Sequence, residues 1–151
     1  MSQSLANVIV HFVFSTKGRH PWLTEHAHCV ELYKYMATSL KTFDSPSIII
    51  NGVSDHVHIL CRLSRNHAIK TVVGNIKADS SKWIKTKGEV YRDFHWQAGY
   101  GAFSVSQSRA DDVQRYIAQQ ETHHKRMTFQ DEFRTLCRRN EVELDERYAW
   151  D

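Results

Sequence analysis

Cysteine is scarce in this chain, and long apolar runs are missing from it. The three cysteines, Cys29, Cys61 and Cys137, are odd in number and widely spaced, and no Cys-x-x-Cys pair occurs. Neither a disulfide framework nor a thiolate zinc site is therefore indicated. No apolar stretch is long enough to cross a bilayer, and the start lacks the basic and apolar regions of a signal peptide. We expect a cytoplasmic protein with no membrane partner.

No internal repeat, low-complexity segment or linker divides the 151 residues, which is an ordinary length for one domain with its own core. Hydrophobic residues make up 41% and charged residues 25%, so a disordered or fibrous chain is disfavoured. The formal charge is +3, and ten histidines could raise it locally. This small basic excess suits a polyanion partner, but it is equally typical of an ordinary solvated surface.

Hydrophobic periodicity divides the chain into strands and helices. In the first half we expect a strand at 7–15, a helix at about 24–40, and a strand at 48–50 joined by a tight turn to a strand at 56–63. In the second half we expect a helix at 69–83, short strands at 91–96 and 102–106, a helix at 111–123, and a last helix from 128 followed by a docked tail. This order predicts an α+β protein with the ferredoxin-like split βαβ fold. One antiparallel sheet would carry two helices on one face, with the C-terminal helices added outside.

The sharpest chemical feature is the sequence His56-Val57-His58 in a predicted strand. Residues two apart in a strand point to the same face, with roughly 6.5–7 Å between their Cα atoms. The two imidazoles can therefore converge on one metal ion. A pair of half-exposed strand histidines explains the tripeptide about equally well. Two ligands also bind a divalent ion poorly, so a further oxygen or nitrogen donor must come from elsewhere.

The second feature is the predicted helix 111–123, in which Tyr116 and Gln120 lie one turn apart and can reach the same spot. A lone tyrosine on a helix is usually a packed aromatic, and Gln120 could be a boundary residue. A phenol with a pKa of about 10 attacks a phosphodiester only when a cation neutralises the phosphate. The histidine pair offers two ligands for such a cation, and Gln120 could offer a third. His123 and His124 are adjacent on the helix, which argues against shared ligation.

Three segments together resemble single-tyrosine transposases of the insertion-sequence 200-like family. Residues 55–60, Asp-His-Val-His-Ile-Leu, resemble its HUH signature (His, bulky hydrophobic, His). Residues 96–106 resemble the segment before the catalytic helix, and residues 116–120, Tyr-Ile-Ala-Gln-Gln, resemble its Tyr-x-x-x-Gln motif. The motifs occur in the family's order and on the expected elements. The turn before the signature departs from the pattern, because Val53-Ser54 stands where Met-Pro is expected.

The resemblance implies one HUH transposase domain over residues 1–151, with the tyrosine helix at about 111–123 and a C-terminal helix and tail at about 128–151. It implies that Tyr116 attacks the scissile phosphate, giving a 5′-phosphotyrosine and a free 3′-hydroxyl that later rejoins the strand. His56, His58 and Gln120 would bind Mg²⁺ or Mn²⁺, and no nucleotide cofactor would be needed. The family also implies a homodimer that recognises hairpins and cuts single-stranded DNA, in many members with the tyrosine helix in the partner's site.

Two other functions compete with transposition. One is that of a related tyrosine nuclease, such as a domesticated protein that processes repeated chromosomal hairpins or an initiator of replication or conjugation. The other is that of a nucleic-acid-binding ferredoxin-like module without chemistry. The last function predicts that Tyr116→Phe leaves every activity unchanged and that added metal has no effect on DNA.

Overall fold

The structure, a computed structural model, describes residues 2–151. Its elements in chain order are β1 (Ile9–Ser15), α1 (His26–Thr42), β2 (Ser47–Val53), β3 (His56–Arg62), α2 (Ile69–Lys85), β4 (Gly101–Val105), α3 (Ala110–Ala118), α4 (Gln120–His123) and α5 (Phe129–Arg139). Short 3₁₀ turns occur at Lys17–Arg19, Glu89–Tyr91 and Gln107–Arg109. No helix within residues 2–151 combines the length and the apolar character that crossing a bilayer requires.

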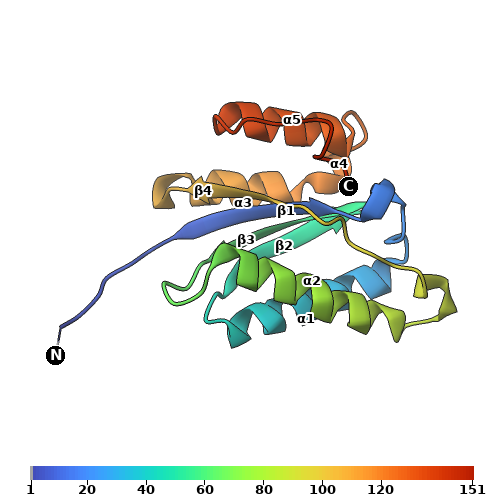
Figure 1. Cartoon of the computed structure of the whole chain (residues 1–151), viewed down its shortest axis with the longest axis horizontal. Coiled ribbons are helices and arrows are strands. Elements are labelled where there is room, and N and C mark those ends of the chain that lie inside the picture. The colour runs from blue at the N-terminus through green and yellow to red at the C-terminus, as the bar shows by residue number, and fades with distance from the viewer. Residues whose placement is uncertain (1) are drawn as a thin grey trace.

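The four strands form one sheet in the order β2-β3-β1-β4, and each neighbouring pair is antiparallel. The element order β-α-β-β-α-β with β1 and β3 at the centre is that of the ferredoxin-like split βαβ fold. The fold predicted from the sequence is therefore confirmed, with the three C-terminal helices as additions to it (Figure 1).

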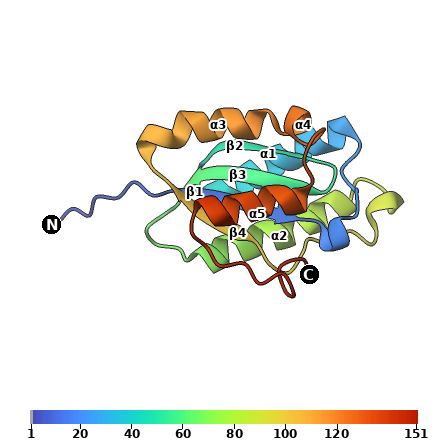
Figure 2. The ribbon, with the colours of Figure 1, turned by 90° about the horizontal axis from the view of Figure 1, so that it is seen from above.

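The sheet lies between two helical layers (Figure 1), and both of its faces are buried. Val10, Phe12 and Phe14 of β1 belong to the larger core, which they share with α1 and α2. The alternate residues Ile9 and Val13 pack instead against α3 and α5. Seen from above, α3 and α5 lie on this second face, with β3 visible between them (Figure 2). The second face is the one that carries the candidate site.

Two predicted elements differ from the observed ones. Residues 91–96 are not a strand, because the buried residues Tyr91, Phe94 and Trp96 are spaced by three and then by two, and the segment is an irregular one that only pairs at a Thr16–Trp96 bridge. The helix predicted at 111–123 is also divided. Gln119, with φ −100° and ψ 19°, separates α3 from α4.

Candidate metal centre and tyrosine site

The β2–β3 hairpin fixes the position of His56 and His58. A two-residue turn at Ser54 and Asp55 pairs Val53 with His56, and Asn51 with His58. The strands approach so closely at Gly52 that a Cβ atom there would lie 2.2 Å from the carbonyl oxygen of His56. Both imidazoles point toward α3, α4 and α5, and both residues are 0% exposed. The alternative of half-exposed strand histidines is therefore wrong, because the C-terminal helices cover this face of β3.

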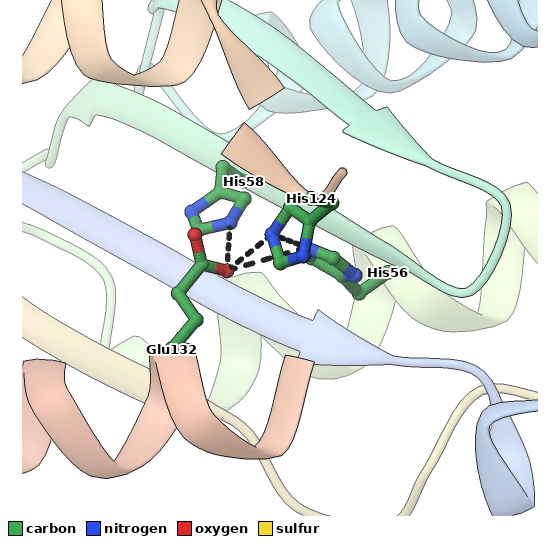
Figure 3. Close-up of side chains that lie close together, drawn as sticks. All are labelled: His56, His58, His124 and Glu132. Carbon is green, nitrogen blue, oxygen red and sulfur yellow. Dashed lines mark hydrogen bonds and ion pairs between the residues drawn. The ribbon is translucent and has the colours of Figure 1, made fainter. Parts of the chain in front are cut away.

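Glu132 of α5 reaches into the same place from the opposite side (Figure 3). Its Oε1 atom lies 2.8 Å from His58 Nε2 and 3.3 Å from His56 Nε2. The same oxygen lies 3.0 Å from Nε2 of His124, the residue that follows α4. One donor atom from each of these four residues lies within 4.8 Å of the others, which is the spacing of a group able to hold a metal ion.

The second oxygen of Glu132 contacts the candidate nucleophile. The hydroxyl of Tyr116 donates a hydrogen bond to Glu132 Oε2, and it lies 3.3 Å from His123 Nε2. The phenol ring meets the His58 ring edge-on, with 5.9 Å between their centroids. One buried carboxylate therefore links the tyrosine hydroxyl to the histidine pair, and all of these groups belong to a single chain.

Gln120 lies beside the histidines as well. It is fully buried, its Oε1 atom is 3.4 Å from His56 Nε2, and its Nε2 atom is 3.4 Å from the carbonyl oxygen of Tyr116. The break at Gln119 is supported by Asn51 of β2, which donates to the carbonyl oxygens of Ile117 (2.9 Å) and Ala118 (3.4 Å). The structure thus brings together the four residues singled out in the sequence: His56, His58, Tyr116 and Gln120.

Each of the two strand histidines has a partner on its other ring nitrogen. His56 Nδ1 is 2.7 Å from Asp55 Oδ1, and His58 Nδ1 is 2.8 Å from Nε2 of the buried His11 in β1. Partners of this kind fix the orientation of a histidine that binds a metal, because they leave Nε2 directed at the ion. Asp55 and His11 therefore act as positioning residues for the pair.

The charges of the site follow from burial and from these contacts. Burial lowers the pKa of His56, but the hydrogen bonds to Asp55 and Glu132 outweigh it and raise the pKa to about 9. Burial dominates at His58 and lowers its pKa despite Glu132. Burial, with the neighbouring His58, lowers the pKa of His11 to about 3. At neutral pH the metal-free site therefore holds a protonated His56 beside two neutral histidines.

The two acidic groups shift in opposite directions. Burial would raise the pKa of Glu132, but hydrogen bonds from His124, His56 and His58 hold it far below its usual range. Burial and the adjacent Glu132 charge raise the pKa of Tyr116 well above its ordinary value. Without a further cation, the phenol therefore keeps its proton and is a weak nucleophile.

The donor set fits a divalent metal ion. Imidazole nitrogens and a carboxylate oxygen are both common ligands of first-row divalent ions, and the four candidate donors converge on one buried point. Mg²⁺ prefers oxygen ligands, whereas Mn²⁺ accepts a mixed nitrogen and oxygen set more readily. Three imidazoles and one carboxylate form such a mixed nitrogen and oxygen set.

Sequence reasoning missed Glu132, His124 and His11. A signal for Glu132 was present, since it stands between Phe129 and Phe133 on the buried stripe of α5 and interrupts that stripe with a charge. His124 was considered only as a possible joint ligand with His123. In the structure the two rings approach different oxygens of Glu132. His11 gave no signal, because only the β1–β3 pairing brings it to His58.

Comparisons with known proteins bear on the family and the fold. Residues 4–120 match the family model described as IS200-like transposase. A crystal structure of a candidate transposase from Deinococcus radiodurans R1 superposes with a TM-score of 0.61 at 20% sequence identity, covering 80% of this chain and 98% of the other. A REP-associated tyrosine transposase bound to a REP hairpin superposes with a TM-score of 0.59 at 12% identity, covering 82% and 74%. No curated protein matches the chain in sequence.

Proposed function

The chain belongs to the family of IS200-like transposases, and from that membership and its site we propose that it cleaves and rejoins single-stranded DNA through Tyr116. The observation that carries the proposal is the convergence on Glu132. The tyrosine hydroxyl and both strand histidines contact this one buried carboxylate, although they come from elements far apart in the sequence. A tyrosine that served only for packing would not need this arrangement.

We assign His56, His58 and Glu132 as the principal metal ligands, with His124 and Gln120 as the nearest further donors. A divalent cation bound there would neutralise the charge of a phosphate oxygen and make the phosphorus a better electrophile. Asp55 and His11 orient the two strand histidines through their Nδ1 atoms. The break between α3 and α4 sets Tyr116 and Gln120 on the same side of the site.

The proposed step is a transesterification. The phenolic oxygen of Tyr116 forms a bond to phosphorus, the bond from phosphorus to the 3′-oxygen breaks, and the strand is left with a 5′-phosphotyrosine and a 3′-oxygen that takes up a proton. Glu132 Oε2 holds the phenol by a hydrogen bond, and His123 Nε2, 3.3 Å from the same hydroxyl, is the acceptor for its proton. Rejoining is the reverse reaction with a 3′-hydroxyl as the nucleophile, so no nucleotide cofactor is consumed.

The substrate we propose is single-stranded DNA with hairpins at the ends of an insertion element, bound by a homodimer of one-domain subunits. A second candidate is the processing of repeated chromosomal hairpins. It is favoured by the likeness in fold to a transposase whose structure was solved with a REP hairpin. The two substrates differ in sequence, so the oligonucleotide that is cut distinguishes them.

The proposal is tested by incubating the protein with Mn²⁺ and single-stranded oligonucleotides taken from the DNA that flanks its gene. A denaturing gel should show a protein–DNA adduct. Tyr116→Phe should abolish the adduct and keep DNA binding, because only a hydroxyl is lost. His56→Ala should weaken Mn²⁺ binding and cleavage together. Tyr148→Phe, at an exposed tyrosine, is the matched control. An adduct formed by Tyr116→Phe would exclude Tyr116 as the nucleophile.

A further inference from the structure

Two hollows in the surface meet at Tyr116. The first has a volume of about 520 Å³ and lies between β4, α3 and α5; the second, of about 420 Å³, lies beside α4 and the segment that joins it to α5. Among residues 2–151, Tyr116 alone lines both of them. A chain-like ligand that occupied both hollows would therefore pass directly over the phenol.

The first hollow offers both cationic and apolar contacts. Arg109 and Arg139 stand at its edge, whereas Phe103, Val113 and Leu136 supply apolar surface. Both arginines are exposed, and within residues 2–151 Arg139 makes no ion pair with a carboxylate. Arg109 pairs with Asp112 at 3.3 Å, but Asp112 also pairs with Arg115, so two arginines share one carboxylate. The rim of the hollow therefore carries a net positive charge.

Arg139 and Tyr116 line the same hollow, so an anion that enters it meets a cationic side chain beside the phenol. The second hollow also places a cationic side chain beside Tyr116. The exposed Arg126 and the half-buried His123 line it together with the tyrosine.

We infer that the two hollows form one track for a single DNA strand, with the nucleotides on either side of the scissile phosphate lying in different hollows. Arg109 and Arg139 bind backbone phosphates on one side of Tyr116, and Arg126 binds a phosphate on the other. Bases lie against the apolar surface of the first hollow. The inference rests on the proposed function, because it places the strand that Tyr116 would cut.

The shape of the surface favours a single strand over a duplex. Proteins read a duplex by inserting a protruding helix or ribbon into its major groove, whereas here the surface is hollowed between two helices. Single strands bind instead in grooves that combine phosphate-binding cations with surfaces on which bases pack. The volume of each hollow is in the range of small-ligand sites, about 300–1,000 Å³, which suits a few nucleotides.

The test measures binding without chemistry. The Tyr116→Phe protein in EDTA is titrated with a fluorescent oligodeoxythymidylate at several salt concentrations. Each phosphate contact to a single strand contributes about 0.7 to the slope of log affinity against log salt. Arg139→Gln and Arg126→Gln should each lower the slope by about 0.7, and the triple variant that includes Arg109→Gln by about three times as much. Arg138→Gln, which removes the same charge from the same helix but lines neither hollow, should change the slope least.

The track would be overturned if the triple variant and Arg138→Gln gave the same slope. It would also be overturned if an unlabelled duplex displaced the oligonucleotide as well as an unlabelled single strand of the same length does. These outcomes are independent of the adduct experiment. If the wild-type protein forms the adduct but the slopes do not change, the track is wrong and the proposed function stands. If the slopes change but no adduct forms, the proposed function fails and the track stands.

Discussion

At the scale of the residue, Glu132 is the group on which the site depends. It is 1% exposed, and its two oxygens contact three histidines of the candidate metal centre and the hydroxyl of Tyr116. A buried carboxylate is tolerated only when its charge is compensated. In the metal-free protein the protonated His56 supplies that compensation, and a bound cation would supply it instead.

Glu132→Gln removes the charge and keeps the shape of the side chain. Because a carboxylate ligand is lost, we expect the Kd for Mn²⁺ to rise by at least about tenfold. Isothermal titration calorimetry measures this, with thermal melts to confirm that the variant is folded. Asp131→Asn, at the exposed neighbouring carboxylate, is the control. An unchanged Kd in Glu132→Gln would remove Glu132 from the ligand set.

The metal-free stability should depend on pH through His56. Its pKa in the folded protein is about 9, above the ordinary value of 6.5, so the folded state binds the proton more tightly than the unfolded state. This contribution to stability is fully present below about pH 6.5 and is lost as the pH rises through about 9. In EDTA, the thermal midpoint should fall across this window, and less so in His56→Gln. Equal pH dependence in both proteins would contradict the His56 assignment.

Metal binding should release the same proton. A histidine binds a metal only in its neutral form, and His56 is protonated below about pH 9, whereas the lowered pKa of His58 means that it contributes no proton. Calorimetry in two buffers of different ionisation enthalpy should therefore report roughly one proton released per Mn²⁺ between pH 6.5 and 9. Asp55→Asn should reduce this number. Release of no proton by the unmodified protein would show that His56 is not a ligand.

At the scale of the element, the break between α3 and α4 positions the tyrosine, and Asn51 supports the break. Asn51→Ala leaves the carbonyl oxygens at the end of α3 without this donor, at a cost of about 1 kcal/mol in stability. A small displacement of Tyr116 should slow adduct formation by about 10–100-fold, while Mn²⁺ affinity changes much less. Asn75→Ala removes a similar side-chain bond to a helix carbonyl in α2 and is the control. Equal rates in the two variants would contradict this role.

The elements that could be predicted are those with a local signal. Short-range patterns predicted the strand β1, the hairpin that leads into His56-Val57-His58, and the helices α2 and α5. The start of α5 follows from Thr128, whose side chain accepts a hydrogen bond from the amide of Asp131. The division of the tyrosine helix was not, because it depends on Asn51, more than sixty residues away. The apolar residues at 91–96 were assigned to a strand because their spacing over a short run is ambiguous.

The residues of the candidate site divide in the same way, because only some of them lie in local sequence motifs. His56, His58, Tyr116 and Gln120 lie within two local motifs, so their spacing alone suggested shared chemistry. His11, His124 and Glu132 join them only through the β1–β3 register and the position of α5 across the sheet. Charged or polar residues in a sequence are usually exposed, and of these three only Glu132, which lies on the apolar stripe of α5, has a local sign of burial.

At the scale of the whole molecule, the C-terminal tail holds α5 in place. Trp150 packs against Phe129 and Phe133, with ring centroids 6.4 and 6.0 Å away. The carbonyl oxygen of Asp151 accepts a hydrogen bond of 2.9 Å from the amide of Ala98. The last residues therefore connect α5, which carries Glu132, to the segment that precedes β4.

Trp150→Ala should consequently weaken both the fold and the metal centre. The ring is only partly buried, so we expect a loss of about 1–3 kcal/mol in the free energy of unfolding, together with weaker Mn²⁺ binding because Glu132 is held less firmly. Denaturant titration and calorimetry measure the two effects. Tyr148→Ala, at a residue that is 71% exposed, should change neither. Unaltered Mn²⁺ affinity in a destabilised Trp150→Ala protein would separate the tail from the site.

The central claim is that Tyr116 becomes covalently joined to DNA at the metal centre. The most direct measurement is peptide mapping by mass spectrometry after the protein has reacted with a single-stranded oligonucleotide and Mn²⁺. We expect one modified peptide that carries a nucleotide 5′-phosphate on Tyr116, and none when Mn²⁺ is replaced by EDTA. A nucleotide attached to any other residue, or an adduct that forms equally well in EDTA, would contradict the claim.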